Sequence, residues 1–256
     1  MRAGSVRGSL GGMGLIAYDD ADAAAFQATR HLPADALAPW RAAITRHLDP
    51  RPGMRLLDLG CGTGSWTRAF GTWWPDVTVV AVDPSPAMRD RAGGTVVLAG
   101  DAASIPAADG SIDAVWISTV IHHVPDLAAA AREIRRVLAP GAPVLIRSAF
   151  PGRGDGLTLC RYWPETIAVL DERYPSVATI AEAFATAGFT VAGLEPVTQV
   201  SAPSLAVAAD GLRRQAHTLL QLISDEAYAN GVDRLRAAAR TVTGPQTDTL
   251  DLLVLR

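Results

Sequence analysis

The sequence predicts an α/β protein built on a doubly wound parallel sheet. Short apolar runs alternate with helical stretches along the middle of the chain, and this alternation implies right-handed crossovers that cover both faces of a parallel sheet. Hydrophobic residues make up 49% of the 256 residues and charged residues 19%. That balance is typical of a compact chain with a sizeable core.

Two helices are expected ahead of the sheet. The first starts near Tyr18, where several aspartates favour a helix N-terminus, and it ends at Pro33. The second runs from Ala36 to Leu48 with apolar side chains at helical spacing, and Asp49-Pro50 stops it.

The central region contains five predicted strands and one well-marked crossover helix. That helix runs from Asp126, a favourable N-cap residue, to Leu138, and Pro140-Gly141 follows it. The strands are apolar runs of the kind that a buried parallel sheet requires. They lie at Met54–Leu59, Val77–Val82, Thr95–Ala99, Ile112–Ser118 and Val144–Ser148.

The last hundred residues depart from simple alternation because helical insertions separate the remaining strands. We predict a helix at Ser176–Ala187, a strand near Phe189–Val200, helices at Ser204–Ile223 and Asp225–Arg240, and a final strand at Thr249–Leu255. The predicted sheet therefore has seven strands.

Composition excludes several kinds of chemistry. The net charge is −3, so neither nucleic acid nor an anionic membrane surface is the expected partner. All 23 basic residues are arginines, which rules out a Schiff-base lysine and a P-loop lysine. Two cysteines are too few for a disulfide framework or a four-thiolate zinc site. A cytoplasmic monomer or homodimer without a metal site is the resulting expectation.

A glycine-rich loop follows the first predicted strand. The segment Asp58-Leu59-Gly60-Cys61-Gly62-Thr63-Gly64 leads into a helix that starts near Ser65. Three glycines allow a sharp turn and a close approach of the backbone to a ligand. A dinucleotide fingerprint would require a further glycine where Ser65 stands, which argues against a nicotinamide or flavin cofactor.

Two carboxylates stand at the ends of the next two strands. Asp83 follows Gly64 by 19 residues and ends the second strand, and Asp101 ends the third. That spacing suits an acid that grips a ribose diol, and ligands of open parallel sheets bind beyond the carboxyl ends of the strands. The glycine loop and both acids are therefore expected to line one pocket.

These motifs, taken in order, resemble those of the class I S-adenosylmethionine-dependent methyltransferases, from Leu56 to about Ser148. The matching segments are LLDLGCGTG, VVAVDPSPAM, GDAASIPAADGSIDAVWISTVIHHVPD and EIRRVLAPGAPVLIRS. The resemblance implies a Rossmann-like seven-stranded sheet whose last strand is antiparallel, with S-adenosylmethionine as cofactor and S-adenosylhomocysteine as its product.

The same resemblance implies roles for individual residues. The Gly60–Gly64 loop would pass beneath the methionine moiety, Asp83 would hold the ribose, and Asp101 would meet the adenine edge. The full predicted cofactor site comprises Arg30, Asp58, Gly60, Cys61, Gly62, Gly64, Asp83, Pro84, Met88, Asp101, Ala102 and Ser118. Arg30 has two readings, a contact to the cofactor carboxylate or an ordinary surface charge.

Candidate catalytic and substrate residues follow the fourth and fifth strands. His122 and His123 are predicted general bases because imidazole titrates near neutral pH, although the pair could instead support its loop. Arg147, Tyr162 and Trp163 offer a cationic and aromatic wall suited to a planar or acidic small molecule. His217 lies beside an apolar helical stripe, and it and the two aromatic residues could equally be packing residues.

We therefore hypothesise a methyltransferase acting on an oxygen, nitrogen or carbon nucleophile of a small molecule, with secondary metabolism as one setting. The rival hypotheses are a related enzyme that catalyses cyclisation or decarboxylation, and a cofactor-binding regulatory module. Residues 1–17 are expected to be a flexible leader, with Met13 as an alternative start, and residues 18–256 a single domain. Within it, residues 18–50 form cap helices, 54–150 the cofactor-binding core, and 151–175 and 201–245 insertions over the substrate.

Overall fold

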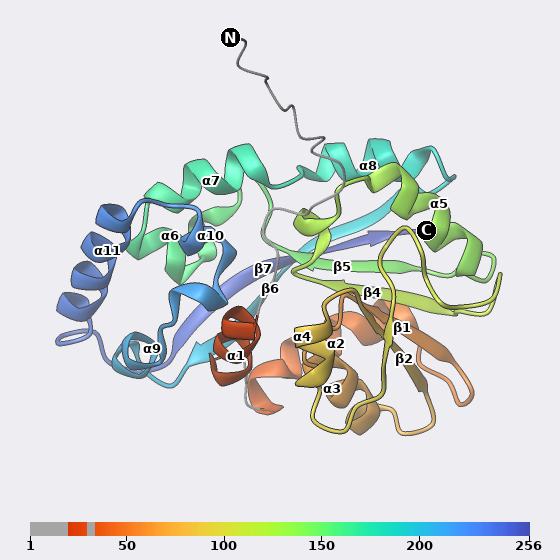
Figure 1. Ribbon diagram of the computed structural model, residues 1–256, viewed down its shortest axis with the longest axis horizontal. Helices are drawn as coiled ribbons and strands as arrows, with labels where there is room; N and C mark the ends of the chain where they lie inside the picture. Colours follow the sequence, from red (N-terminus) through yellow and green to blue (C-terminus); the bar gives the residue numbers. More distant parts are fainter. Residues whose placement is uncertain (1–19, 30–33) are drawn as a thin grey trace, which may run out of the picture.

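The computed structural model describes residues 20–29 and 34–256, and its centre is a seven-stranded sheet (Figure 1). The strand order is β3-β2-β1-β4-β5-β7-β6. The first five strands are parallel, whereas β7 runs antiparallel to both of its neighbours. The bounds are β1 Arg55–Leu59, β2 Thr78–Asp83, β3 Val97–Ala99, β4 Ala114–Ser118, β5 Val144–Ser148, β6 Val191–Ala202 and β7 Gln246–Leu255. The predicted seven-stranded fold with an antiparallel last strand is confirmed.

Helices cover both faces of the sheet, as the alternation predicts. On one face α5 (Leu127–Val137) and α8 (Val177–Ala185) pack on alternate strand residues such as Leu57 and Ile117. On the other face α2 (Ala38–Leu48) and α3 (Ser65–Trp73) pack on the intervening residues, such as Leu56 and Trp116. Side chains that alternate across each strand therefore build two separate cores.

Local capping explains where the crossover helices start. The Asp126 carboxylate accepts a hydrogen bond from the Ala129 amide at 2.8 Å, and the Ser176 hydroxyl accepts one from the Thr179 amide at 3.0 Å. Each cap satisfies an amide that the first helical turn leaves without an intrahelical partner. The predicted starts of α5 and α8 are confirmed.

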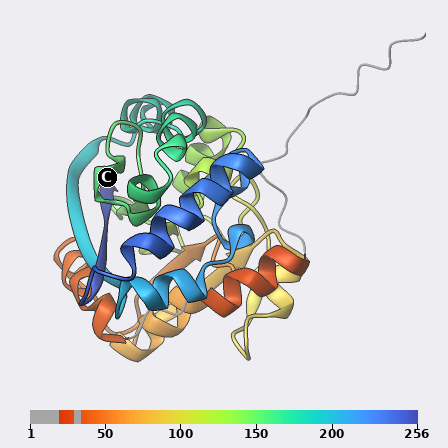
Figure 2. The same ribbon diagram turned by 90° about the vertical axis from the view of Figure 1, so that its left-hand side faces the viewer.

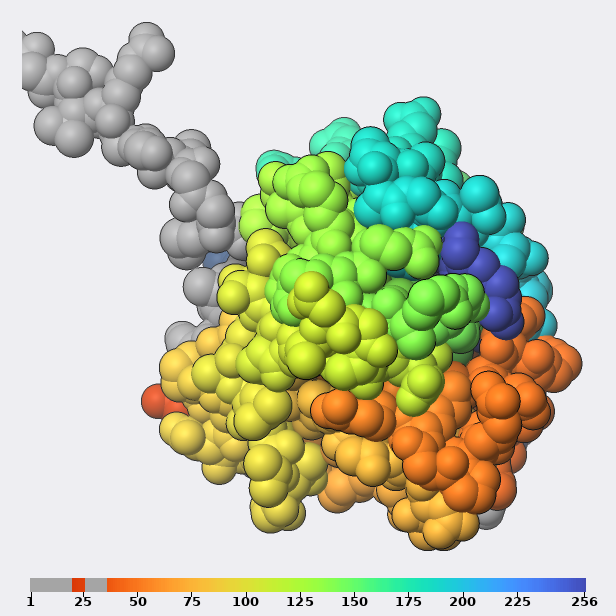
Figure 3. All heavy atoms as spheres, turned by 90° about the vertical axis from the view of Figure 1, so that its right-hand side faces the viewer, coloured from red at the N-terminus to blue at the C-terminus, as the bar shows by residue number. Residues whose placement is uncertain are grey.

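The amino edge of the sheet is closed by the end of the chain. The Arg256 backbone pairs with Thr190 just before β6, and its guanidinium donates to the His47 carbonyl at the end of α2 at 2.9 Å. Figure 3 shows the last residues, in dark blue, at the surface between cyan and orange segments. Arg256 therefore joins the segment before β6 to the end of α2 at this edge.

Helices gather beyond the carboxyl edge and form what we call the cap (Figures 1 and 2). From the first half of the chain it takes α1 (Asp20–Thr29), which contacts η4 (Arg214–Ala216). Its other elements are α6 (Thr158–Tyr162), α7 (Glu165–Arg173), α9 (Leu205–Gly211), α10 (Thr218–Gln221) and α11 (Asp225–Ala238). The remaining short elements of the chain are η1 (Ala34–Leu37), α4 (Pro86–Asp90), η2 (Ile121–His123) and η3 (Gly154–Gly156).

The prediction of one helix over Ser204–Ile223 is wrong, because the segment is broken into α9, η4 and α10. The Arg214 guanidinium donates to the carbonyls of Leu220 and Ile223 at 2.9 and 2.5 Å, and it also pairs with Asp225. These bonds hold the chain folded back after η4 and satisfy carbonyls at and beyond the C-terminal end of α10. Apolar periodicity does not reveal such a side-chain bond.

The structure bears on two further expectations. The predicted leader of residues 1–17 and the predicted cofactor contact Arg30 lie outside the described residues. Across residues 20–29 and 34–256, no helix is long and apolar enough to cross a membrane.

Candidate functional site

The glycine loop that follows β1 adopts the left-handed backbone that its sequence allows. Gly60, Gly62 and Gly64 have φ of 72°, 57° and 75°, a region that side chains with a Cβ rarely enter. A Cβ on Gly60 would also lie 2.6 Å from a Val120 methyl carbon. Glycine is therefore required here, and the loop presses against the chain that follows β4.

Asp83 at the end of β2 ties the glycine loop to the next strand. One carboxylate oxygen accepts the Gly62 amide at 2.7 Å, and the other accepts the Ser85 amide at 2.9 Å. The side chain is buried, and burial raises the pKa of its carboxyl against the opposing effect of these two hydrogen bonds. A carboxylate accepts about four hydrogen bonds, so Asp83 retains capacity for a ligand. Met88 is buried on α4 just behind it.

Asp58 lies beneath the same loop and is almost entirely buried, with 1% of its surface exposed. Its carboxylate accepts the Thr67 hydroxyl of α3 at 2.6 Å. Burial is the main cause that raises its pKa to about 7; the hydrogen bonds from Thr67 oppose the rise, and the nearby charge of Asp83 adds to it. An acid with such a pKa is half protonated near neutral pH.

Asp101 follows β3, whose residue Ala99 pairs with Asp83 of β2. The Asp101 side chain is exposed and accepts the Ala103 amide at 2.9 Å, which holds the chain in a tight turn. Ala102 is half-buried and Pro84 is exposed. Parallel strands end at one edge, so the acids Asp83 and Asp101 follow adjacent strands there, as the sequence predicts.

The chain beyond β4 makes an unusual turn. Thr119 has φ of 54°, which strains a β-branched residue, and strain of this kind clusters at functional sites. The turn leads into η2, where the His122 ring stacks on Tyr174 with centroids 3.9 Å apart. His123 Nε2 lies 3.4 Å from the Thr218 hydroxyl of the cap. Burial lowers the pKa of His123 to about 4, so its imidazole is neutral at physiological pH.

Arg147 of β5 occupies the same edge and is buried, with 5% of its surface exposed. Its guanidinium donates to Ser118 Oγ at 3.2 Å and to Gln199 Oε1 at 3.0 Å. The cation also lies over the rings of Trp40 and Trp66, 4.9 and 5.5 Å from their centroids. Arg147 therefore joins β4, β5 and β6 under the cap.

The remaining predicted substrate residues belong to the cap. Trp163 is fully buried and donates to the Tyr228 carbonyl at 3.0 Å, so its ring packs the cap interior and forms no wall for a ligand. Tyr162 is half-buried, and its carbonyl accepts Arg234 of α11. His217 stands between η4 and α10, where the chain is extended. The structure thus brings Arg147 to the strand ends and leaves Trp163 in a core.

Comparison with known proteins identifies the domain. A family model described as a methyltransferase domain matches residues 57–146. This central part of the chain is therefore a methyltransferase domain. A demethylmenaquinone methyltransferase of Roseiflexus sp. (strain RS-1) is 39% identical over 113 residues, 41% of this chain and 47% of that protein. A malonyl-[acyl-carrier protein] O-methyltransferase of Erwinia pyrifoliae is 32% identical over 157 residues, 59% and 58% of the two chains.

Structural similarity extends further along the chain than sequence similarity. A putative methyltransferase from an antibiotic biosynthesis pathway of Anabaena variabilis has a TM-score of 0.65 and 18% identity, over 84% of this chain and 94% of that one. The chain spans about half the length of the two curated relatives. The family model, over residues 57–146, covers the glycine loop and the two acids.

The residues at the carboxyl edge of the methyltransferase domain fit S-adenosylmethionine. The glycine loop is a cradle that a Cβ would fill at Gly60, and the buried carboxylates of Asp58 and Asp83 suit an ammonium and a ribose diol. Cys61, which the sequence also predicts here, is a buried thiol whose pKa burial raises. The Cys61 thiol is therefore neutral and adds no charge to the site.

Several residues of the site escape sequence reasoning because long-range packing positions them. The partners Thr67, Gln199, Tyr174 and Thr218 come from four different elements. Only Gln199 carries a signal in the sequence, as a polar residue inside a predicted strand two positions after apolar Val197. No cluster of three metal-ligating side chains occurs in the described part of the chain.

Proposed function

We propose that this methyltransferase domain transfers a methyl group from S-adenosylmethionine to an oxygen, nitrogen or carbon nucleophile of a small molecule. The observation that carries the proposal is the glycine loop held to Asp83 at the end of β2, next to Asp101 after β3. When bound, the cofactor supplies an electrophilic methyl group on a positively charged sulfur.

The chain's own residues bind and orient the two reactants. Asp83 accepts the ribose hydroxyls with the capacity that Gly62 and Ser85 leave, and Asp58 faces the ammonium of the methionine moiety. The acceptor approaches from the ends of β4 and β5, where Ser118 and Arg147 lie. Alignment of this kind can contribute on the order of 7–11 kcal/mol to a transfer reaction.

His123 is the better placed of the two histidines to accept a proton from the acceptor. Its imidazole is neutral because burial lowers its pKa to about 4, whereas the His122 ring is engaged in the stack on Tyr174. A base with so low a pKa removes protons only from acidic groups. So weak a base suits an acceptor whose nucleophile is already ionised or readily loses its proton, such as a carboxylate or an acidic enol.

The two relatives are named for methyl transfer to demethylmenaquinone and to a malonyl-[acyl-carrier protein]. By analogy with them, the acceptor proposed here is an oxygen or carbon nucleophile. A net charge of −3 supports a small molecule over a nucleic acid as the partner. Secondary metabolism and a cytoplasmic location stay predictions from the sequence.

Calorimetry with S-adenosylhomocysteine tests the proposal directly. We expect the wild-type chain to bind S-adenosylhomocysteine and Asp83→Ala to lose at least tenfold in affinity. The control Asp113→Ala, at the amino edge of β4, should bind with unchanged affinity. Folded protein that fails to bind S-adenosylhomocysteine would refute the proposed function. Binding without transfer of a labelled methyl group to a panel of acidic acceptors would favour the rival reaction on the same fold.

A further inference from the structure

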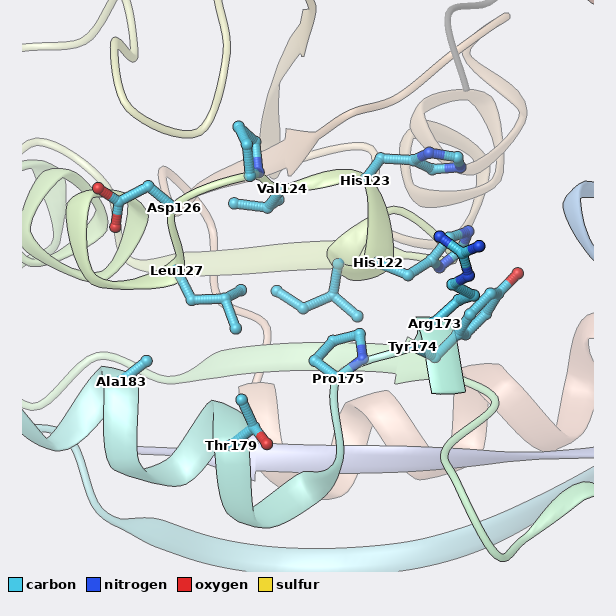
Figure 4. A pocket seen from close by; sticks show the side chains of 12 residues that line it. His122, His123, Val124, Asp126, Leu127, Arg173, Tyr174, Pro175, Thr179 and Ala183 are labelled. Carbon is cyan, nitrogen blue, oxygen red and sulfur yellow. The ribbon is translucent and has the colours of Figure 1, made fainter. Parts of the chain in front are cut away.

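A hollow of about 670 Å³ opens beside the chain that follows β4 (Figure 4). Its walls are η2 with the start of α5, the end of α7 with the linker to α8, and one face of α8. The volume is in the range of small-molecule sites. None of the glycine-loop residues lines the hollow, so it is distinct from the cofactor cradle.

The lining divides into a polar end and an apolar floor. Arg173, Tyr174 and the two histidines gather at one end in Figure 4. Away from that end the hollow is lined by Val124, Leu127, Pro175 and Ala183. Thr179 and Asp126 lie beside them, and the Asp126 carboxylate accepts the Ala129 amide of α5. Such a surface suits an elongated molecule with an acidic group at one end and apolar carbon along the rest.

The polar end is continuous with the proposed reaction centre. His122 and His123 line the hollow and also follow the strained Thr119 turn at the end of β4. Tyr174 fixes the wall because its ring stacks on His122 at an interplanar angle of 11°. A molecule whose acidic end reaches the ends of β4 and β5 can therefore leave its apolar part in the hollow.

We propose that the hollow binds the non-reacting part of the methyl acceptor, and that the acceptor is an acidic amphiphile whose anionic end pairs with Arg173. This inference rests on the proposed methyl-transfer function. The apolar part lies along Val124, Leu127 and Pro175 and extends to Ala183 on α8. The guanidinium of Arg173 supplies the fixed positive charge at the polar end, since His123 is neutral.

The test titrates three probes, decanoate, hexanoate and decanol, into the chain saturated with S-adenosylhomocysteine. A fully buried methylene improves affinity about fourfold, so a half-buried one improves it about twofold. Four more methylenes should then make decanoate bind at least tenfold more tightly than hexanoate. The charge of Arg173 should make decanoate bind more tightly than decanol.

Matched variants locate the binding. Ala183→Trp fills the apolar end, and we expect it to remove the tenfold preference for decanoate, whereas Ala185→Trp on the exposed side of α8 should leave it intact. Arg173→Gln should remove the preference for decanoate over decanol, and the exposed Arg132→Gln on α5 should not. None of the four changes should alter binding of S-adenosylhomocysteine, which separates this test from that of the cofactor site.

Two results would overturn the proposal. The first is S-adenosylhomocysteine binding together with equal effects of Ala183→Trp and Ala185→Trp on the probes, because the hollow would then play no part. The second is a preference for decanoate over decanol that persists in Arg173→Gln, because the anionic end would then pair with a group other than Arg173.

Discussion

Replacing Asp58 by asparagine should stabilise the ligand-free protein at neutral and alkaline pH. The carboxyl is buried under the glycine loop, and burial raises its pKa from 3.8 to about 7. A raised pKa means that the folded state holds the proton more tightly than the unfolded chain does. Folding therefore weakens as the pH rises from about 4 to about 7, where the buried side chain must ionise.

The size of the effect follows from that pKa. At about 1.4 kcal/mol per pKa unit, the rise from 3.8 to about 7 corresponds to about 4 kcal/mol above pH 7. Asparagine never ionises, and its carbonyl oxygen still accepts the Thr67 hydroxyl. For a chain of this length, a gain of that order raises the melting temperature by on the order of 10 °C.

Thermal unfolding of both proteins between pH 4 and pH 9, without ligand, measures the effect. We expect equal stability near pH 4 and a gap that widens up to about pH 7 and then stays constant. Asp113→Asn, at the amino edge, is the control and should show no such widening. A gap that is independent of pH would refute the reasoning, because the stabilisation would then not come from ionisation of Asp58.

Three further predictions concern the loop, the histidine and the cap. Gly60→Ala should destabilise the fold by about 2 kcal/mol and weaken S-adenosylhomocysteine binding, and adding Val120→Ala should restore part of both. Unweakened binding by Gly60→Ala alone would contradict the predicted clash with the Val120 side chain. NMR should show no protonation of the His123 ring between pH 5 and 8, and the contribution of this ring to stability should be lost as the pH falls from about 6.5 to about 4. A titration midpoint of the ring near pH 6.5 would show that it is exposed. Arg214→Met should lower the free energy of unfolding by about 2 kcal/mol and speed amide hydrogen exchange over residues 212–224, whereas the control Arg213→Met should not. Equal exchange in the two variants would mean that Arg214 does not hold the chain between α9 and α10 in place.

Sequence reasoning reached the fold because its signals are local. The strands are short apolar runs, and residues such as Asp126 and Ser176 cap the very helices that they precede. The cap was predicted less well because one arginine, Arg214, breaks a segment whose apolar spacing reads as a single helix. Residues that act across the fold carry no local signal. Thr218, for example, reaches His123 from 95 positions away.

The order of the motifs predicts where Asp58 and Asp83 lie, but it does not predict the protonation state of either carboxyl. Spacing along the chain places Asp58 and Asp83 at the carboxyl edge, but the pKa of a carboxyl depends on how deeply it is buried and on what donates to it. Asp83 accepts two backbone amides, whereas Asp58 accepts one hydroxyl in a fully buried position. The two aspartates therefore differ in the hydrogen bonds that oppose the effect of burial on each pKa.

Strand alternation nevertheless contains more of the site than the motifs show. Side chains two positions apart in a strand lie on the same face of the sheet. In four strands, a polar residue stands two positions after a residue of the core beneath α2 and α3. The pairs are Leu56 and Asp58, Trp116 and Ser118, Leu145 and Arg147, and Val197 and Gln199. Hydrogen bonds join three of these polar residues, Ser118, Arg147 and Gln199. The opposite face stays apolar along β1 and β4, at Leu57, Leu59, Val115 and Ile117. A single face of the sheet, the one beneath α2 and α3, therefore turns polar where its strands end.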